Sequence, residues 1–336
     1  MNYFVVQKWQ NTQSNHAGMV HLCKKIKELD PKNVKLFIVP NVRFRGKNNK
    51  ILQDITYLIF AIFIFITIRK KGHKLFLMEY LLPTHNQHII AKLLSMYKSL
   101  KVYGLAHLVP SDLSRYFIED KTIKQWNKPL EGIITLGSSL SRYLCNRGIP
   151  QNKIHTLFHY VDLEYYKNEV PTAPPTTALT VIIMGNMKRD MDSIVNIVNN
   201  TPNTHFILCC GNKHIDIKRF KHLQNIRLYK FIPENQLLSL MKEADISLNV
   251  MYDTIGSNVI TTSLAMGLAI IASDVGSIRD YCTVDNCIFC KDNKEINKAL
   301  EFLSHNKDTL AQMKKASITL AKKLSIERFY TELNKL

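Results

Sequence analysis

Residues 253–280 read DTIGSNVITTSLAMGLAIIASDVGSIRD, and this stretch decides the fold of the second half of the chain. A loop of small residues at 256–258 precedes a predicted helix that runs to Met266. Gly267 ends that helix, and the apolar run 269–272 predicts a strand that leads into a second glycine-containing loop. Helix, strand and loop in this order indicate one repeat of a parallel α/β sheet.

The start of the predicted helix is a candidate anion site. The first N–H groups of a helix have no partner within the helix, so they can bind phosphate oxygens. A well-capped βα repeat without a ligand has the same pattern. Both interpretations stay open at this point.

Short apolar runs that predict strands alternate with amphipathic stretches that predict helices along the whole chain. The predicted strands are 3–6, 34–39, 74–79, 101–105 and 132–136 in the first half, and 180–184, 205–209, 226–228, 246–249, 269–272 and 288–289 in the second.

A proline-rich segment, 169–179 (EVPTAPPTTAL), separates the two series of strands. Each proline fixes φ and disfavours helix at the residue before it, so this segment should be extended. We therefore expect an α/β protein with two doubly wound Rossmann-like domains that face each other across a cleft. The expected parts are an N-terminal domain at 1–170, a linker at 171–179, a C-terminal domain at 180–320, and a C-terminal helix at 321–336 that packs back on the first domain.

Composition limits the class of protein. The chain has 336 residues, about two domains' worth, and its 46% of hydrophobic residues excludes a disordered or fibrous class. Lys and Arg number 45 against 27 Asp and Glu, so an anionic partner is expected: nucleic acid, an acidic membrane or a phosphate-bearing substrate. Because no zinc-finger, RNP-like or helix-turn-helix pattern is present, nucleic acid is not expected as a partner.

The seven cysteines do not form a recognisable metal or disulfide pattern. The C-x-x-C at 287–290 has apolar middle residues on a predicted strand, and no second ligand pair follows. We expect reduced, buried thiols, a cytosolic compartment and no metal site. His85, Asn86 and His88 have H-x-x-H spacing without a nearby third ligand, so they are interpreted as structural residues or as polar lining of an acceptor site.

The most apolar stretch is Ile55–Ile68, followed by the basic residues 69–71. Fourteen helical residues span about 21 Å, less than the ~30 Å of membrane hydrocarbon, so a spanning helix is not expected. Two interpretations remain: a core helix, or a helix that lies in the surface of an anionic membrane. The N-terminal residues lack the long apolar region of a signal peptide.

A second candidate anion loop is 185–190, directly after a predicted strand. Lys188 and Arg189 could donate charge-assisted hydrogen bonds to a diphosphate, although a Lys-Arg pair in a loop is commonly just solvated. The chain has no GxxxxGK[ST] and no GxGxxG, so the sequence gives no basis for ATP hydrolysis or dinucleotide binding.

Several segments, in order, resemble the donor-binding domain of GT-B glycosyltransferases. The likeness is to the large retaining, family-four type group that includes bacterial polysaccharide, O-antigen and capsule enzymes. It covers roughly residues 130–336, whereas the first 130 residues are similar mainly in layout. The segments are GIPQNKIHTLFHYVDLEYY (148–166), VIIMG (181–185), FILCCG (206–211), NIRLYKFIP (225–233), LSLMKEADISL (238–248) and SNVITTSLAMGLAIIASDVG (257–276).

The resemblance implies a nucleotide-sugar donor, with a UDP-sugar favoured, bound by the second domain, and an acceptor bound by the first. It implies no metal requirement. The implied catalytic residues are His107, Asp253 and Thr254. The implied donor-binding residues are Gly18, Gly185, Asn186, Lys188, Arg189, Phe231, Ser257, Asn258, Val259 and Thr262.

The chain departs from the family pattern at two positions. Two glutamates, eight residues apart, contact the donor in the family, and Thr254 and Thr262 stand in their places here. Threonine cannot supply a carboxylate, although Asp253 could compensate for the first. Two functions therefore stay open. One is a retaining hexosyl- or N-acetylhexosaminyltransferase, acting on a lipid-linked bacterial surface glycan at the inner face of the cell membrane. The other is a catalytically inactive scaffold that binds glycan or a partner enzyme.

Overall fold

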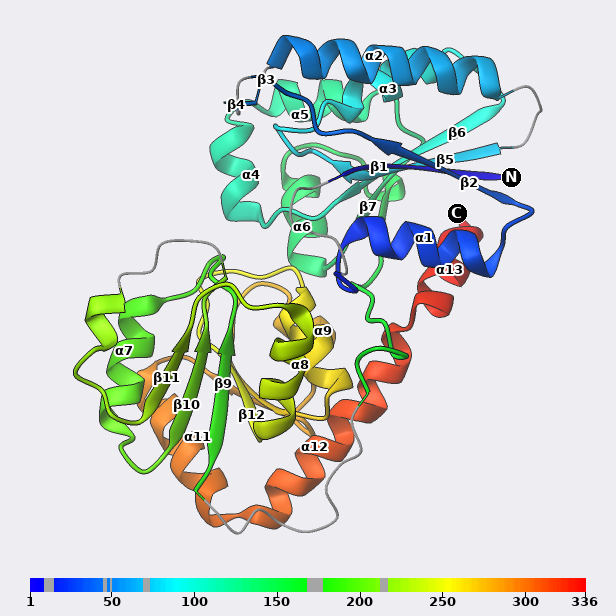
Figure 1. The fold of residues 1–336 in the computed structure, drawn as a ribbon. Coiled ribbons are helices and arrows are strands. Elements are labelled where there is room, and N and C mark those ends of the chain that lie inside the picture. Colours follow the sequence, from blue (N-terminus) through cyan, green and yellow to red (C-terminus); the bar gives the residue numbers. More distant parts are fainter. Residues whose placement is uncertain (9–14, 45–46, 49, 69–72, 168–177, 212–216) are drawn as a thin grey trace. The chain divides into compact units, whose positions relative to one another are not determined.

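The computed structural model describes residues 1–8, 15–44, 47–48, 50–68, 73–167, 178–211 and 217–336. The chain divides into two compact units (Figure 1). Unit 1 comprises Met1–Phe158 and Ile326–Leu336, and unit 2 comprises His159–Ser325. The first division therefore falls after Phe158 rather than at residue 170, and most of the expected linker at 171–179 lies outside the described residues.

Unit 1 contains a six-stranded parallel sheet in the order β2-β1-β5-β6-β7-β8. A small antiparallel pair, β3 with β4, lies outside it. The strands are β1 Asn2–Gln7, β2 Val34–Val39, β3 Arg43–Phe44, β4 Lys47–Asn48, β5 His73–Tyr80, β6 Leu100–Ala106, β7 Gly132–Thr135 and β8 Ile154–Thr156.

The helices of unit 1 cover its sheet on two sides: α2 and α3 lie over one face, and α1 and α13 lie over the other (Figure 1). The last helix, α13, is tied to the first strand, because Asn2 Nδ2 donates to Asn334 Oδ1 over 2.7 Å. The helices are α1 Met19–Leu29, α2 Lys50–Thr67, α3 Gln87–Leu94, α4 Pro110–Tyr116, α5 Asp120–Asn127, α6 Ser138–Asn146, the 3₁₀ turn η1 Gln151–Lys153, and α13 Ile326–Lys335.

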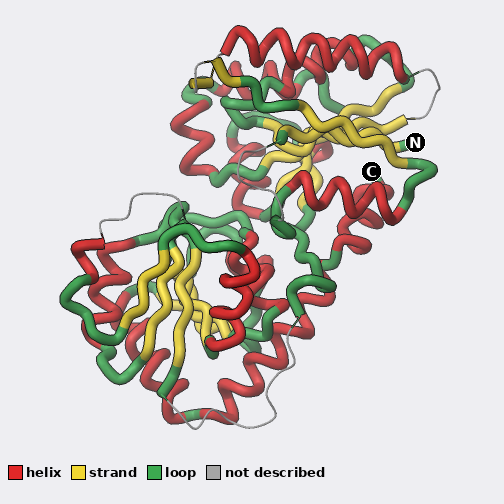
Figure 2. Tube along the Cα trace, in the orientation of Figure 1, coloured by secondary structure: helices red, strands yellow, loops and turns green. Residues whose placement is uncertain are grey.

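Unit 2 contains a second six-stranded parallel sheet, in the order β11-β10-β9-β12-β13-β14, and Figure 2 shows its strands between helices. The strands are β9 Thr180–Met184, β10 His205–Cys209, β11 Ile226–Tyr229, β12 Ile246–Asn249, β13 Ala269–Ser273 and β14 Cys287–Cys290. The helices are α7 Met191–Asn200, η2 Ile217–Phe220, α8 Glu234–Glu243, α9 Asn258–Ala265, α10 Ile278–Tyr281, α11 Asn293–His305, α12 Lys307–Ala321 and η3 Lys322–Leu324.

The α/β class and the predicted strands are confirmed. Parallel strands are covered on both faces, so they are apolar along their length, and residues 181–183 of β9 are fully buried. Strand β8 and the β3–β4 pair were not predicted, because they are only two or three residues long. The cysteines are free thiols, and all but Cys145 are buried. Burial raises the pKa of Cys290 to about 12, so this thiol is protonated at neutral pH.

The strand order locates the ligand edge of each sheet. In unit 2 the chain proceeds from β9 to β10 and β11, and then returns to place β12 on the other side of β9. Helices on opposite faces diverge at such a switch point, and ligands of open α/β sheets bind there, beyond the carboxyl ends of the strands. In unit 1 the corresponding point lies between β1 and β5.

Candidate functional site

Two loops meet at the switch point of unit 2. The main chain of residues 188–190, after β9, pairs with that of residues 250–252, after β12. Asp190 N donates to Val250 O over 3.1 Å, and Tyr252 N donates to Lys188 O over 2.9 Å. Lys188 has a φ of +57°, an unusual conformation for a residue with a side chain. The pairing therefore holds the loop in a defined shape at the carboxyl ends of β9 and β12.

Arg189 is the most unusual side chain of this loop. It is only 7% exposed, and its Nε donates to Met184 O over 3.1 Å. Its Nη1 is buried and has no hydrogen-bond partner among the described residues. Burial lowers the pKa of Arg189 to about 10, so the guanidinium is still charged at neutral pH. Because a buried charge is costly unless an opposite charge compensates it, this position favours an anionic ligand.

The first turn of α9 lies against the same loop. Gly185 has a φ of +77°, and a Cβ built on it would lie 3.5 Å from Val259 Cγ2. Ser257 caps the helix, since its Oγ accepts from Ile260 N over 3.4 Å. Asn258 Oδ1 is buried and has no partner among the described residues. The N-terminus of α9, with its positive dipole end, is thus adjacent to the strand end that carries Arg189.

The loop after β13 locks the loop after β12 in place. Ser277 N donates to Thr254 O over 2.7 Å. Gly276 has a φ of +58°, and a Cβ at this position would overlap the main-chain oxygen of Thr254. Only glycine therefore fits here without a shift of the backbone. The close approach makes the 253–257 segment rigid.

The two threonines that the resemblance sets against glutamates form hydrogen bonds with nearby backbone. Thr254 is buried, and its Oγ1 accepts from Gly256 N over 3.2 Å. Thr262 is also buried, and its Oγ1 donates to Asn258 O over 2.6 Å. Asp253 is half-buried, and its Oδ1 lies 2.9 Å from the Cβ position of Gly276. Asp253 is thus the carboxylate of the 253–257 segment.

Two other predicted donor-binding residues have different surroundings. The Nδ2 of Asn186 donates to Cys210 O over 2.7 Å, so this side chain joins the ends of β9 and β10. Phe231 is 57% exposed and follows β11, which is an edge strand two positions from β9. The structure therefore gives Asn186 a structural contact and leaves Phe231 exposed in the segment after the edge strand β11.

Gly18 and His107 belong to unit 1. Gly18 is the N-cap residue of α1, and His107 directly follows β6. Burial and the charge of His107 lower the pKa of His85 to about 3, so His85 is neutral near pH 7. His85 Nε2 lies 3.8 Å from Oε2 of the buried Glu79. This carboxylate oxygen accepts a hydrogen bond from Gln7 N over 2.7 Å.

Glu79, His85 and His107 thus form a polar cluster near the carboxyl ends of β5 and β6. Glu79 was not predicted as a site residue, although an acid at the end of the apolar run KLFLME (74–79) is a recognisable signal. The neighbours of His85 point elsewhere: Asn86 Nδ2 donates to Asp54 Oδ1, and the His88 ring stacks on Trp126 with centroids 4.0 Å apart. The H-x-x-H pattern therefore does not bring its side chains to one point.

A hollow of about 710 Å³, not predicted from the sequence, lies beside the switch point of unit 2. Two of its acids have internal partners: Asp274 accepts two hydrogen bonds from Arg279, at 2.8 and 2.9 Å, and Asp190 caps α7. Its volume is in the range of small-molecule sites. The lining residues are Asp190, Ser193, Val250, Met251, Tyr252, Ser273, Asp274, Val275, Cys290, Lys291, Asp292, Asn293, Lys294 and Ile296.

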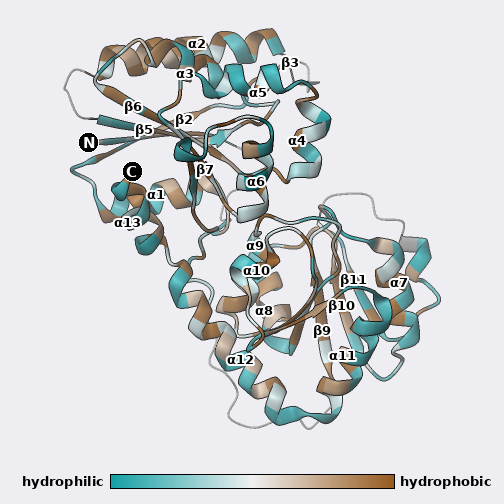
Figure 3. Cartoon of the chain, turned by 180° about the vertical axis from the view of Figure 1, so that it is seen from behind, coloured by the Kyte–Doolittle hydropathy of each residue, from teal (hydrophilic) through white to brown (hydrophobic). Residues whose placement is uncertain are grey.

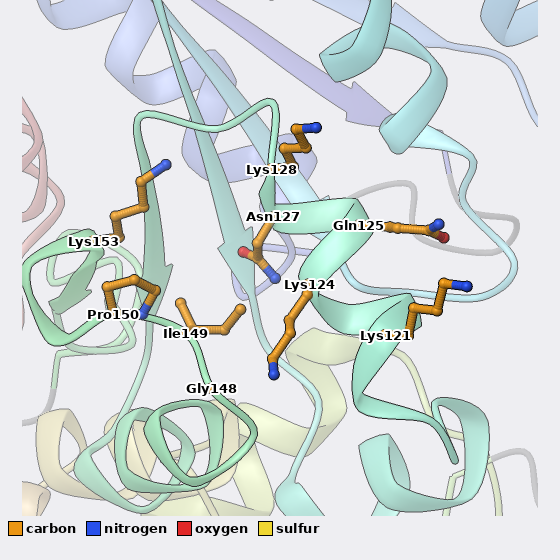
Figure 4. Close-up of a pocket in the computed structure, with 9 residues that line it drawn as sticks. All are labelled: Lys121, Lys124, Gln125, Asn127, Lys128, Gly148, Ile149, Pro150 and Lys153. Atoms are coloured by element: carbon orange, nitrogen blue, oxygen red, sulfur yellow. The ribbon is translucent and has the colours of Figure 1, made fainter.

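Unit 1 has a hollow of about 600 Å³ with a basic lining (Figure 4). Its lining includes Lys121, Lys124, Lys128 and Lys153 and contains no acidic residue. The surrounding segments lead into β7 and β8, so this hollow lies at the amino ends of those strands. It is therefore at the opposite edge of the sheet from the polar cluster.

Two parallel six-stranded sheets of this order, each with its own switch point, define a protein with the GT-B fold. Residues 179–306, which include the Arg189 loop and α9, match the model of the family "Glycosyl transferases group 1". A sequence comparison with curated proteins gave no match.

Solved structures resemble the whole chain. HepE from Anabaena, in complex with UDP and glucose, has a TM-score of 0.69 at 11% identity, over 99% of this chain and 100% of that chain. The apo form of the lipopolysaccharide outer core galactosyltransferase WaaB has a TM-score of 0.68 at 11% identity, over 100% of both chains. Sucrose-phosphate synthase from Thermosynechococcus elongatus has a TM-score of 0.73 at 10% identity, over 100% of this chain and 98% of that chain. The predicted resemblance to GT-B glycosyltransferases is confirmed.

Proposed function

We propose that this protein is a glycosyltransferase that uses a nucleoside diphosphate sugar, with a UDP-sugar as the favoured donor. The observation that carries the proposal is the buried guanidinium of Arg189, which has a hydrogen-bonding nitrogen without a partner among the described residues, at the switch point of unit 2. A diphosphate supplies the missing negative charge. The family match over residues 179–306 and the UDP complexes of HepE support the same donor class.

In the proposed reaction, the bond between C1 of the donor sugar and the diphosphate oxygen breaks. The acceptor hydroxyl oxygen bonds to C1, its proton passes to an oxygen of the departing diphosphate, and the nucleoside diphosphate leaves. Arg189, Lys188 and the N-terminus of α9 stabilise the charge that develops on the leaving diphosphate. Because these groups supply positive charge themselves, we propose a metal-independent transfer of a hexose or N-acetylhexosamine. Retention of the anomeric configuration is proposed from the family likeness.

The acceptor is proposed to be a hydroxyl of a lipid-linked bacterial surface glycan precursor, met at the cytoplasmic face of the cell membrane. The polar cluster of Glu79, His85 and His107 is the candidate acceptor site of unit 1, because it lies at the ligand edge of that sheet. The name of the similar protein WaaB, a lipopolysaccharide outer core galactosyltransferase, supports an acceptor of this class.

A second candidate function is a catalytically inactive scaffold that binds glycan or a partner enzyme. It is favoured by the two threonines at the glutamate positions, since both hydroxyls already bond to local backbone. Asp253 is the residue that separates the two functions. If the protein is an enzyme, Asp253 is required for turnover. If it is a scaffold, there is no turnover for the loss of Asp253 to change.

The test measures UDP binding by calorimetry and then UDP release from UDP-sugars, with and without EDTA, in membranes that contain candidate acceptors. Binding plus release that Asp253→Asn abolishes supports the transferase. UDP binding without UDP release from any donor sugar supports the scaffold. Failure to bind UDP, GDP, CDP or dTDP overturns the transferase and favours the scaffold. The control is Asp280→Asn, an exposed acid of α10 in the same unit.

A further inference from the structure

Helix α2 buries polar side chains and exposes large apolar ones, which is the opposite of an ordinary surface helix. Its side against the sheet includes the polar residues Gln53 and Tyr57 together with Ala61 and Ile64, all buried. Tyr57 Oη donates to Gln7 Oε1 of β1 over 2.8 Å, and Gln53 Oε1 accepts from Val42 N over 3.3 Å. Polar side chains are thus used on the inner side of this helix.

The outer side of α2 is apolar and uncovered. Ile51 is 71% exposed, Ile59 is 59% and Ile66 is 58%, and these positions extend along the full helix. Figure 3 shows the resulting hydrophobic colour of α2. The large apolar side chains that are exposed on this helix are Ile51, Ile55, Leu58, Ile59, Ile62, Phe63, Phe65 and Ile66. Eight exposed large apolar side chains on one helix of a folded domain indicate an interaction surface.

Among the described residues, α2 is the one helix long and apolar enough to cross a membrane. Its packing favours a different position. The inner side is held against α3 and β2, and its hydrogen bond to β1 fixes it lengthwise on unit 1. A helix that is anchored along one side and apolar along the other can lie in the plane of a membrane surface with its apolar side in the lipid.

The charge distribution favours an anionic membrane over a second copy of the chain as the partner of the outer side of α2. Unit 1 contains 26 Lys and Arg against 10 Asp and Glu, whereas unit 2 contains 19 against 17, so almost all of the net charge of +18 belongs to unit 1. An anionic bilayer attracts such a unit. Two copies of it repel each other, which disfavours a dimer through the same surface.

We propose that the outer side of α2 is a membrane-docking surface that inserts into the headgroup region of an anionic phospholipid bilayer. This inference deepens the proposed function, on which its link to a lipid-linked acceptor rests. Through this surface unit 1 stays at the membrane. A lipid-linked acceptor can then reach the enzyme by lateral diffusion. The basic surface of the unit contributes attraction, and the apolar side chains of α2 contribute insertion.

The experiment measures co-flotation of the full-length protein with vesicles of phosphatidylcholine alone and of phosphatidylcholine with phosphatidylglycerol. The test variant carries Ile59→Asp and Ile66→Asp together, on one side of α2. The control variant carries Val284→Asp, at a position of unit 2 that is 77% exposed. We expect wild type and control to bind anionic vesicles, less so at high salt. We expect the double variant to lose at least about tenfold in partitioning, because two apolar side chains no longer enter the lipid.

Three results overturn the proposal. Wild type does not bind anionic vesicles, or the double variant binds them as well as wild type does. The third is that wild type is a dimer in sedimentation velocity and the double variant is a monomer. In the last case a second copy covers α2. The substituted positions are exposed, so the variants should fold. An unchanged thermal unfolding midpoint checks that they do. UDP titration without vesicles separates this proposal from the proposed function. Wild type that binds anionic vesicles but not UDP contradicts the transferase, and wild type that binds UDP but not anionic vesicles contradicts the docking surface.

Discussion

Arg189 Nε donates to the main-chain oxygen of Met184, 3.1 Å away, where β9 ends. This bond holds the guanidinium inside unit 2, although the residue belongs to a loop. One nitrogen is thereby used for structure, while the buried Nη1 is left without a partner among the described residues. The arrangement positions a charge before any ligand arrives, which reduces the cost of binding an anion there.

Replacing Arg189 should weaken nucleotide binding strongly. Charge-assisted hydrogen bonds contribute about 1.5–3 kcal/mol, so Arg189→Ala should raise the Kd for UDP by roughly 10- to 100-fold in calorimetry. Arg189→Lys should recover only part of this loss, because one ammonium cannot reproduce the planar fork. The control is Arg219→Ala, which removes an exposed ion pair with Asp192 in the same unit. An unchanged Kd in Arg189→Ala would place the diphosphate elsewhere.

Two glycines of the site should differ sharply when replaced by alanine. Both have positive φ, but a Cβ at Gly276 overlaps Thr254 O, whereas a Cβ at Gly185 meets Val259 at an ordinary 3.5 Å. Gly185→Ala should therefore cost about 1 kcal/mol, the strain of the backbone conformation alone. Gly276→Ala should cost about 2–4 kcal/mol, because the backbone must also shift. Thermal unfolding of both variants checks the order, and equal midpoints would contradict the role of the close contact.

The inner side of α2 should be sensitive to loss of one hydroxyl. Tyr57→Phe removes the donor to Gln7 Oε1 and leaves a buried acceptor without its bond, at a cost of about 1–2 kcal/mol. Trp126 lies in unit 1, so denaturation followed by tryptophan fluorescence reports on this unit. The matched control is Tyr116→Phe, at an exposed position. If both variants unfold at the same denaturant concentration, the Tyr57–Gln7 bond contributes nothing to stability.

Protonation of His159 in the unfolded chain should lower the stability of the protein in mild acid. Burial lowers the pKa of His159 to about 4, below its ordinary value of 6.5, although a hydrogen bond to Tyr160 O opposes the shift. Between these values the unfolded chain binds a proton that the folded chain does not. The free energy of unfolding therefore decreases as the pH falls from 6.5 towards 4, by about 1.4 kcal/mol per pH unit from this residue.

The measurement is denaturation at pH 7 and pH 5, followed by circular dichroism, for wild type and His159→Gln. Other groups contribute to the total pH dependence, so the difference between the two proteins isolates His159. The variant should lose less stability between pH 7 and pH 5 than wild type does. An identical loss in both would show that His159 is protonated in the folded state as well.

Much of the fold could be predicted because parallel strands are continuous apolar runs. Residues 34–39, 180–184, 205–209 and 246–249 were predicted as strands and have those exact bounds. The three-residue β8 could not be predicted, since so short a run has no periodicity. The domain boundary also escaped prediction: proline content points to residues 169–179, whereas the packing of residues 159–166 assigns them to unit 2.

The candidate site was predicted in part. The loops with Gly185, Lys188 and Ser257 follow strands in the sequence, so their position at the carboxyl edge could be inferred. The burial of Arg189 and the contact of Asn186 with Cys210 could not, because both depend on residues that pack from other strands. Glu79 was missed for the same reason, since only the fold brings it to Gln7 and His85.

By itself, the sequence determined the α/β class, the order of strands and helices, and the glycines at which the chain must turn, because these depend on local patterns of apolar side chains and on backbone freedom. The tertiary structure alone decided which charges lie inside and which apolar side chains lie outside. An apolar run such as 55–66 is equally consistent with a core helix and with a surface helix, and only its packing shows that the side with Tyr57 faces the sheet and the side with Ile59 is exposed. Burial is a property of how distant segments pack, so neighbouring residues in the sequence do not determine it.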